Sequence, residues 1–207
     1  MTLKLRELSL KPDLFGNGHG LCAGCAESVS VRQILSALEN PPVVALATGC
    51  LEVSTTRFPD TTWKVPVIHS AFENSATTIG GVEAAYKALV RKGRMEERPL
   101  TFVVFAGDGA TYDIGFQWLS GALERGHKFV YICLNNEGYM NTGIQRSSAT
   151  LLGAWTTTTP SGSVRPGKPE WHKDMTKIIA AHGIPYVAQA ASHNWKDLMT
   201  KVRKAEQ

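Results

Sequence analysis

The sequence contains no long apolar run and few cysteines, and both features restrict the class of protein. No stretch of its 207 residues approaches the roughly 20 consecutive apolar residues that span a bilayer. Residues 1–15 alternate charge with leucine, whereas a signal peptide has a continuous apolar region. We therefore expect a cytoplasmic protein without membrane association, whose four cysteines are thiolate ligands or core residues rather than a disulfide framework.

Charge is too balanced along the chain to indicate a nucleic-acid partner. The 22 basic and 18 acidic residues give a net charge of +4, which is little for a protein that binds phosphate backbones. The only dense basic cluster, near the end, consists of Lys196, Lys201, Arg203 and Lys204. The 43% hydrophobic content is enough for one large α/β domain.

The centre of the sequence has the pattern of a β-α-β unit. Residues 101–105 and 129–134 are apolar, β-branched runs typical of strands, and residues 114–125 have the spacing of an amphipathic helix. Gly107-Asp108-Gly109 follows the first run and Asn135-Asn136 follows the second. Because parallel strands end at the same edge of a sheet, both motifs should meet where α/β proteins bind ligands.

These two motifs together favour a metal-bridged diphosphate. Glycines let the backbone approach a diphosphate ahead of a helix N-terminus, and Asp108 and the amide oxygen of Asn136 are hard ligands suited to Mg²⁺. Gly-Asp-Gly alone is a common turn. The 25 residues from Ala110 to Leu134, however, give a spacing that resembles the thiamine diphosphate motif. By that resemblance Asp108, Asn136 and the carbonyl of Gly138 would hold Mg²⁺.

The remaining sequence continues the alternation of strands and helices. Together with the central unit, it predicts a doubly wound α/β domain with a mostly parallel sheet. The further strands are expected at 42–48, within 61–70 and at 185–190, and the further helices at 26–39, 72–90, 173–182 and 195–204. The expected buried residues are Val29, Ile34, Leu35 and Leu38 in the first helix and Trp195, Leu198 and Val202 in the last.

Three of the cysteines fall at the ends of predicted elements. Cys22 and Cys25 precede the helix that begins at Ala26, where amide dipoles favour the thiolate, and their two-residue spacer lets both sulfurs face one centre. Cys50 follows a buried strand, at the same edge of the sheet. A metal ion, an iron–sulfur cluster and a redox disulfide all remain open at this point. Cys133 lies inside a predicted strand, where we expect an inert buried thiol.

Several segments of the chain resemble one enzyme family. They are HGLCAGCAE, ATGCLEVSTTRFP, VIHSAFENS, GDGATYDIGFQ, NNEGYMNTGIQRSS and GAWTTTTP. They resemble the thiamine-binding β subunits of the 2-oxoacid:ferredoxin oxidoreductases, most closely those of the pyruvate synthase type, from about Gly18 to Arg203. The resemblance implies that residues 19–207 form a thiamine diphosphate-binding domain. Residues 1–18, which have no sustained period, are expected to form an N-terminal arm over a surface.

The resemblance also implies an activity that needs several subunits. In this family the enzyme decarboxylates pyruvate or a related 2-oxoacid oxidatively to acyl-CoA and CO₂ and passes electrons to ferredoxin. The implied cofactors are thiamine diphosphate, Mg²⁺ and a [4Fe-4S] cluster, and the implied partners are coenzyme A, ferredoxin, and alpha, gamma and delta-type subunits. Another subunit would supply the pyrimidine-binding domain and the glutamate that activates thiamine, so this chain would be inactive alone.

By the same resemblance, residues in the matching motifs acquire roles. Cys22, Cys25 and Cys50 would bind the cluster, and Asn141 would face the reacting carbon as the catalytic residue. The implied cofactor contacts are Glu27, Cys50, Gly107, Asp108, Gly109, Ala110, Asn136, Gly138, Asn141 and Thr142. In the family a fourth cysteine ligand follows the last helix, and this sequence ends at Gln207 without one. We therefore expect a chain that lacks the family's C-terminal segment, or whose tail is supplied elsewhere.

Two alternative functions fit part of the pattern. A non-redox thiamine diphosphate-dependent 2-oxoacid decarboxylase or synthase subunit shares the Gly-Asp-Gly to Asn-Asn motif but not the three cysteines. A truncated, non-catalytic module would bind the cofactor without turnover.

Four further side chains receive predictions from their position. His69, at the end of a short strand, either faces the cofactor or caps a loop, and Tyr139 is expected to pack rather than to catalyse. Residues 156–170 are polar and rich in proline and glycine, typical of a surface excursion or a subunit contact. Arg165 and Lys168 in this segment are expected to meet only solvent.

Overall fold

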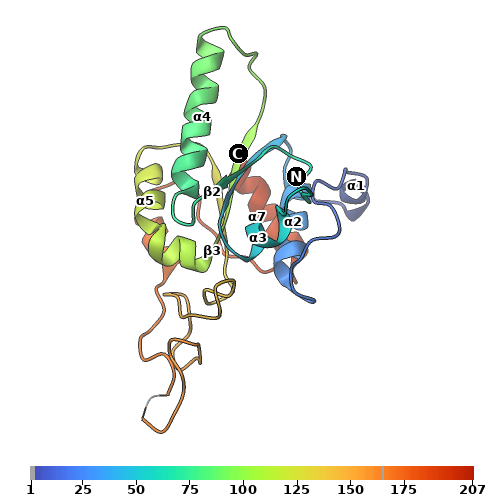
Figure 1. Cartoon of the computed structure of the whole chain (residues 1–207). Helices are drawn as coiled ribbons and strands as arrows, with labels where there is room; N and C mark the ends of the chain where they lie inside the picture. The colour runs from blue at the N-terminus through green and yellow to red at the C-terminus, as the bar shows by residue number, and fades with distance from the viewer. Residues whose placement is uncertain (1–2, 165) are drawn as a thin grey trace.

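Parallel strands form the central sheet of the structure, a computed structural model that describes residues 3–164 and 166–207 (Figure 1). The strands are β1 (Pro42–Ala47), β2 (Val67–Ser70), β3 (Thr101–Gly107) and β4 (Val130–Leu134), in the order β2-β1-β3-β4. All neighbouring pairs are parallel, and β1 and β3 are buried along almost their whole length, as expected for strands covered on both faces.

Helices cover both faces of this sheet. They are α2 (Ala26–Ala37), α4 (Ser75–Arg91), α5 (Phe116–Glu124) and α7 (Trp195–Glu206). Along β3, Val103 and Phe105 pack in the core under α2 and α7, whereas Val104 and Ala106 pack in the core under α4, because successive side chains of a strand point to opposite faces. The predicted doubly wound α/β fold with a mostly parallel sheet is confirmed.

Shorter elements lie at the ends of the strands and near the termini. They are α1 (Leu5–Ser9), α3 (Cys50–Thr55), the π-helix η1 (Gly109–Ile114) and α6 (Met175–Ala180). Over residues 3–164 and 166–207, no helix has the length and apolar character needed to cross a membrane.

The described part of the N-terminal arm lies against the chain's own body. Phe15 is fully buried, and its ring meets that of Trp63 edge-on, with the centroids 5.0 Å apart. The two residues also pair as an isolated antiparallel bridge. Residues 1 and 2 of the predicted arm lie outside the described residues.

The helix predicted over 114–125 is observed as α5, and the chain between β3 and α5 also forms the π-helix η1, which the sequence did not predict. The break falls at Gly115, where a Cβ atom would lie 2.3 Å from the carbonyl oxygen of Ala110 and 2.6 Å from that of Glu73. Only glycine fits this close approach of two backbones. Since π turns are frequent at functional sites, the irregularity directs attention to the start of η1.

Residues 185–190 do not form the predicted strand. The segment is largely exposed and lies beside α7, where the ammonium group of Lys204 is 5.1 Å from the centroid of the Tyr186 ring. Lys201 Nζ donates a hydrogen bond of 2.6 Å to the carbonyl of Gln189. The segment thus contacts α7 through the Tyr186 ring and the Gln189 carbonyl and adds no strand to the sheet in the described residues.

The predicted buried face of α2 is correct except at Val29. Ile34, Leu35 and Leu38 are buried as predicted, whereas Val29 is 48% exposed and Val31, which was not predicted, is buried instead. At 3.6 residues per turn, Val29 lies about 200° around the helix from Val31 and thus on the solvent side.

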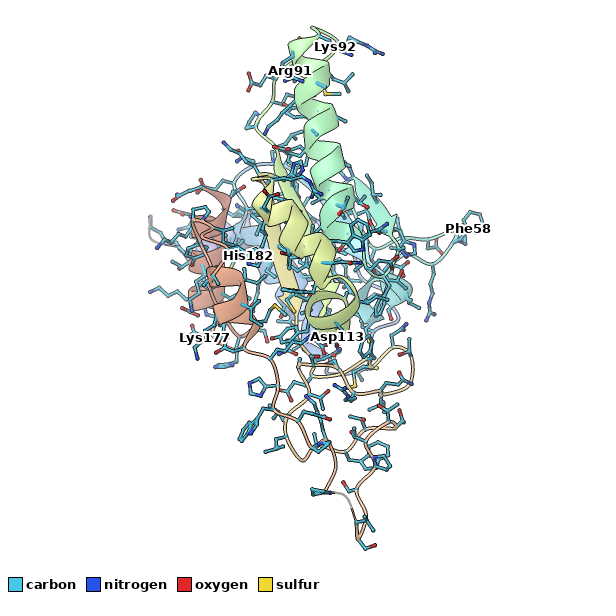
Figure 2. All side chains as sticks on the ribbon, turned by 90° about the vertical axis from the view of Figure 1, so that its left-hand side faces the viewer. Phe58, Arg91, Lys92, Asp113, Lys177 and His182 are labelled. Atoms are coloured by element: carbon cyan, nitrogen blue, oxygen red, sulfur yellow. The ribbon has the colours of Figure 1, made fainter. Side chains whose placement is uncertain are left out.

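The segment between β4 and α6 extends away from the sheet (Figures 1 and 2). Figure 2 shows it beyond Asp113, at the end opposite to Arg91 and Lys92. Lys168 in this segment was predicted to face solvent, but it is only 1% exposed, and its Nζ donates a hydrogen bond of 2.6 Å to the carbonyl of Thr150. The polar composition of the loop gave no sign that this side chain folds inward. Arg165 lies outside the described residues.

Candidate functional site

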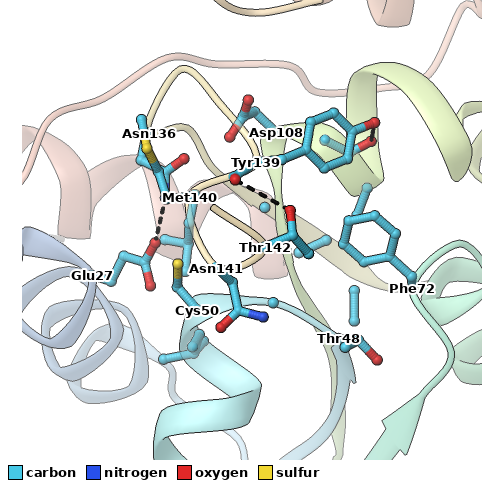
Figure 3. Close-up of a pocket in the computed structure, with 18 of the residues that line it drawn as sticks. Glu27, Thr48, Cys50, Phe72, Asp108, Asn136, Tyr139, Met140, Asn141 and Thr142 are labelled. Carbon is cyan, nitrogen blue, oxygen red and sulfur yellow. Dashed lines mark hydrogen bonds between the residues drawn. The ribbon is translucent and has the colours of Figure 1, made fainter. Parts of the chain in front are cut away.

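A pocket of about 120 Å³ opens at the carboxyl edge of the sheet, where β1, β3 and β4 end. Figure 3 shows that its walls come from α2, the start of α3, the β3 turn and the loop after β4. The residues predicted to contact a cofactor all line it: Glu27, Cys50, Gly107, Asp108, Gly109, Ala110, Asn136, Gly138, Asn141 and Thr142. The parallel register, with Gly107 opposite Leu134, brings the two central motifs together as predicted.

Asp108 has one satisfied and one unsatisfied carboxylate oxygen. The side chain is 1% exposed, and Oδ2 accepts a short hydrogen bond from the hydroxyl of Ser147. Oδ1 is buried without a hydrogen-bond partner. Burial raises the pKa of Asp108 to about 6, against the hydrogen bond from Ser147, which lowers it. A buried carboxylate oxygen without a partner is costly unless a cation or donor meets it.

Asn136, in the loop after β4, has the same arrangement. Its Nδ2 donates a hydrogen bond of 3.1 Å to Oε1 of Glu27 (dashed in Figure 3), and its Oδ1 is buried without a partner. Burial raises the pKa of Glu27, and the hydrogen bond from Asn136 lowers it. Because Glu27 holds Nδ2 of Asn136, it leaves Oδ1 as the amide atom available to a ligand in the pocket.

The donor set formed by these oxygens fits Mg²⁺. A carboxylate oxygen of Asp108 and an amide oxygen of Asn136 are hard ligands, and Mg²⁺ is commonly bound by one or two protein oxygens together with phosphate oxygens. Within the described residues there is no group of three His, Cys, Asp or Glu side chains arranged to hold a metal ion. An Asp–Asn–carbonyl site would not form such a group, because two of its three protein ligands are amide and backbone oxygens.

In Gly107-Asp108-Gly109, the two glycines are needed for different structural reasons. A Cβ on Gly109 would lie 2.4 Å from Cε1 of the Tyr139 ring, whereas a Cβ on Gly107 would meet no protein atom within 4 Å. Gly109 therefore allows the loop after β4 to pack on the β3 turn. Gly107 leaves open space beside Asp108, which is where a bound diphosphate would need it.

The loop after β4 is held closely over η1. The Tyr139 ring packs in a tilted orientation against Phe72, with the ring centroids 5.7 Å apart, and its hydroxyl lies 3.2 Å from both the carbonyl of Gly109 and Oδ2 of Asp113. This agrees with the predicted packing role of Tyr139. Asn141 and Thr142 follow at the exposed rim of the pocket.

Burial disfavours the thiolate form of three cysteines, Cys25, Cys50 and Cys133. Burial raises the pKa of Cys50 to about 11, and the nearby Glu27, Cys25 and Cys22 add to this shift. Burial also raises the pKa of Cys25, so the predicted thiolate-stabilising effect of the α2 N-terminus is outweighed. The three cysteines do not form a preorganised metal site in the described residues. Cys133 lies in β4 as predicted, and burial raises its pKa to about 12.

His69 contacts protein groups beside the pocket. Its Nε2 lies 2.8 Å from Oγ1 of Thr48, and its Nδ1 lies 3.4 Å from Oε1 of Glu52. Thr48 lines the pocket, whereas His69 does not. These contacts favour the structural role for His69.

Ser147 is a site residue that sequence reasoning missed. It is separated from Asp108 by 39 residues along the chain and belongs to no recognised ligand pattern. The QRSS end of a family-like segment contains it, but nothing local distinguishes it from the adjacent Ser148.

The comparison with protein families identifies the domain. The family model described as thiamine pyrophosphate enzyme, C-terminal TPP binding domain, matches residues 47–207. The chain belongs to the thiamine pyrophosphate enzymes. Both central motifs of the pocket lie within the matched region.

Relatives of this thiamine pyrophosphate domain share about half of its sequence. Pyruvate synthase subunit PorB of Methanocaldococcus jannaschii is 52% identical over 196 residues, which cover 94% of this chain and 66% of the relative. The PorB subunit of Thermotoga maritima is 52% identical, over 91% of this chain and 59% of the relative. Ketoisovalerate oxidoreductase subunit VorB of Pyrococcus abyssi is 42% identical, over 93% and 61%. The predicted resemblance to pyruvate synthase subunits is confirmed.

A solved structure has the same fold. It is the 2-oxoglutarate:ferredoxin oxidoreductase from Magnetococcus marinus with 2-oxoglutarate, coenzyme A and succinyl-CoA bound, with a TM-score of 0.74 at 22% identity over 95% of this chain and 63% of that chain. The chain spans about two thirds or less of the length of these relatives.

Proposed function

We propose that this chain is the thiamine diphosphate-binding β subunit of a cytoplasmic 2-oxoacid:ferredoxin oxidoreductase that acts on pyruvate or a related 2-oxoacid. The complete enzyme removes CO₂ from the 2-oxoacid, passes two electrons singly to ferredoxin and transfers the acyl group to the sulfur of coenzyme A. Relatives named pyruvate synthase and ketoisovalerate oxidoreductase support this assignment, and the matching family model supports the cofactor.

The structural observation that best supports the proposal is a pair of side-chain oxygens without hydrogen-bond partners. Oδ1 of Asp108 and Oδ1 of Asn136 are both buried without partners in the same pocket. Each belongs to a side chain whose other polar atom is already held by the protein. Two such oxygens are expensive in an empty protein interior and become favourable when a divalent cation binds them.

Specific residues then take specific tasks. Asp108, Asn136 and the Gly138 carbonyl would hold Mg²⁺, which would offset the charge of the diphosphate. The backbone of Gly107, Gly109 and Ala110 and the side chain of Thr142 would bind the phosphate oxygens, as in other glycine-rich turns that precede helices. Thiamine diphosphate, when bound, supplies the nucleophilic carbon and the electron sink for decarboxylation.

The neighbouring pocket residues serve the cofactor ring and the substrate. Asn141, at the exposed rim, donates a hydrogen bond to the substrate. Glu27 and Cys50 contact the cofactor on the opposite wall.

A second subunit completes the site. The pocket of about 120 Å³ is small beside the roughly 300–1,000 Å³ of typical ligand sites, as expected when one wall belongs to another chain. Met140 and Ile144, near the rim, are exposed apolar side chains that would be covered by such a partner. The alpha, gamma and delta-type subunits of the same oxidoreductase are the proposed partners, and one of them supplies the pyrimidine-side glutamate.

Cys22, Cys25 and Cys50 are proposed as three ligands of a [4Fe-4S] cluster. Such clusters are usually bound by four cysteine thiolates, and this sequence offers no fourth cysteine at the same sheet edge, since Cys133 lies inside β4. These three cysteines would therefore supply three of the four ligands. No electron-transfer step is assigned through them. The fourth ligand has to come from further sequence or another thiol.

Reconstitution is the decisive experiment for the function. This chain is assembled anaerobically with its partner subunits, Mg²⁺ and thiamine diphosphate, and ferredoxin reduction is followed with pyruvate, 2-oxoisovalerate or 2-oxoglutarate in the presence of coenzyme A. We expect reduction with pyruvate or a related 2-oxoacid, dependent on coenzyme A, and no turnover by this chain alone.

Other outcomes contradict the proposal in identifiable ways. Release of CO₂ without ferredoxin reduction or bound iron favours a non-redox thiamine enzyme. Cofactor binding without turnover in the full assembly favours a non-catalytic module. Robust activity of this chain alone refutes the shared site.

A further inference from the structure

The turn formed by Ser147 and Thr150 contacts both halves of the proposed metal site. On one side the Ser147 hydroxyl binds Oδ2 of Asp108, which follows β3. On the other side the Thr150 hydroxyl donates a hydrogen bond of 2.6 Å to the carbonyl of Glu137. Glu137 is the residue between Asn136 and Gly138, so one turn spans the two loops that carry the proposed Mg²⁺ ligands.

The directions of these hydrogen bonds follow from counting protons. Thr150 Oγ1 uses its only proton on the carbonyl of Glu137 and accepts from the backbone N–H of Ser147 at 2.9 Å. Ser147 Oγ accepts from the backbone N–H of Ala149 at 3.1 Å, a bond that does not use its own proton. Because a hydroxyl has a single proton, that of Ser147 is directed to the carboxylate of Asp108. Ser147 thereby occupies Oδ2 and leaves Oδ1 for a cation.

Burial makes this arrangement rigid. Ser147 and Thr150 are 1% and 2% exposed, so water does not compete for their hydrogen bonds. The buried Lys168 donates to the carbonyl of Thr150 at 2.6 Å, and the backbone N–H of Lys168 binds the carbonyl of Ala154 at 3.0 Å. Lys168, in the segment between β4 and α6, is thus hydrogen-bonded to the same turn.

The backbone conformation of Glu137 independently indicates that the hydrogen bond from Thr150 is needed. It has a positive φ of 65° without being glycine, a conformation that is uncommon for side chains larger than glycine's hydrogen. Such a conformation persists when surrounding contacts fix it. The hydrogen bond from Thr150 to its carbonyl is a contact of this kind, and it sets how Asn136 and Gly138 face the pocket.

We propose that Ser147 and Thr150 form a brace that positions Asp108 and the 136–138 turn for the cation, so that both are positioning residues for Mg²⁺ and its diphosphate. This inference rests on the proposed Mg²⁺ site and assigns residues to it that no motif indicated. Groups that orient metal ligands typically contribute about 10–100-fold to metal affinity, which is the size of effect to be measured.

The adjacent serine provides a matched control. Ser148 lies in the same turn, but its hydroxyl and its backbone N–H, the latter at 2.9 Å, bind the carboxylate of Asp113 rather than that of Asp108. Removing the Ser148 hydroxyl disturbs the same segment without touching the brace. A general loosening of the loop would therefore affect Ser148→Ala as much as Ser147→Ala.

The test uses the assembled oxidoreductase stripped of metal and cofactor. Mn²⁺ replaces Mg²⁺ and is titrated with thiamine diphosphate present, with paramagnetic resonance reporting free and bound metal and calorimetry reporting cofactor binding. We expect Ser147→Ala and Thr150→Val each to weaken Mn²⁺ binding about 10–100-fold and to alter the bound-metal spectrum. Ser148→Ala should resemble the wild type, and excess metal should restore cofactor affinity in Ser147→Ala.

Separate results identify which idea fails. If Asp108→Ala binds metal and cofactor like the wild type, the proposed Mg²⁺ site itself is wrong. If Asp108→Ala abolishes binding while Ser147→Ala shows unchanged metal affinity and spectrum, the brace is wrong. Equal losses in Ser147→Ala and Ser148→Ala, without rescue by metal, also overturn it. Should Thr150→Val fail to assemble, Ser147→Ala alone decides.

Discussion

The side-chain amide of Asn136 is held by Oε1 of Glu27 at 3.1 Å, across 109 residues of sequence. Helix α2 on one wall of the pocket thereby orients a group that follows β4 on another wall. The consequence is that Oδ1 of Asn136, and not Nδ2, faces the place where a cation would bind. Cation binding should therefore depend on a residue that does not itself need to contact the metal.

Replacing Glu27 tests this orientation. Glu27→Ala leaves Nδ2 of Asn136 without an acceptor and frees the amide to rotate, so we expect Mg²⁺-dependent thiamine diphosphate affinity to fall about 10–100-fold. Glu27→Gln retains an acceptor oxygen and should stay much closer to the wild type. Calorimetry on the assembled complex measures both. Equal loss in the two variants would show that the carboxylate charge matters, rather than the acceptor.

The glycines of the β3 turn give a pair of opposite predictions. Gly107→Ala adds a methyl group where no protein atom lies within 4 Å, so stability should be unchanged while cofactor binding is blocked. Gly109→Ala places Cβ 2.4 Å from the Tyr139 ring and should destabilise the chain by about 1–3 kcal/mol. Denaturant unfolding and calorimetry separate the two effects. Normal cofactor affinity in Gly107→Ala would mean that the diphosphate lies elsewhere.

The motif glycines and their strands were predictable because their signals are local. The periods of strands and helices and the spacing from Gly107 to Asn136 can be read from neighbouring residues. Because parallel strands end at the same edge of a sheet, these local signals also predict that the two motifs lie together. The two motifs accordingly line one pocket, together with the other residues that the family resemblance implied at the cofactor. The strand predicted at 185–190 and the burial predicted for Val29 are wrong. Both predictions used the period of apolar residues alone and did not consider which element the residues would pack against.

Contacts between distant segments were not predictable from one sequence. The bond from Ser147 to Asp108 and the burial of Lys168 depend on how the excursion after β4 folds back, and polar loops carry no period that reports this. The raised pKa values of Cys25 and Cys50 also depend on neighbours brought in by folding. For Cys25, position at a helix N-terminus predicted the opposite shift.

Cysteine variants test the proposed cluster ligands. In an anaerobically purified complex that supplies a fourth ligand, Cys50→Ala should lose most of its iron, because the four ligands of the cluster then fall to three and one iron has no protein ligand. Cys133→Ser should retain iron, since this thiol lies within β4. Iron analysis and low-temperature paramagnetic resonance measure both. Loss of iron in Cys133→Ser with retention in Cys50→Ala would invert the ligand assignment.

Glu83 should make folding stability depend on acid pH. Burial opposes its ionisation, but hydrogen bonds with Lys87 and His127 outweigh this and hold its pKa below the usual 4.5. Since the unfolded state then binds protons more readily, the stabilisation is complete above pH 4.5 and is lost as pH falls through the lower folded pKa.

The variant Glu83→Gln removes this charge. We expect it to lower the free energy of unfolding at neutral pH by about 1–3 kcal/mol and to flatten the stability profile in acid. Denaturant unfolding of this chain across the acid range is the measurement. An identical slope for the wild type and Glu83→Gln would exclude Glu83 as the titrating group.

The most direct test of the central proposal is calorimetric titration of the assembled, metal-free complex with thiamine diphosphate, with and without Mg²⁺, for wild type, Asp108→Asn and Asp108→Ala. We expect tight binding only with Mg²⁺ in the wild type, intermediate affinity for Asp108→Asn, and no Mg²⁺-dependent binding for Asp108→Ala, because the diphosphate charge is then uncompensated. Unchanged Mg²⁺-dependent affinity in Asp108→Ala would contradict the proposed site.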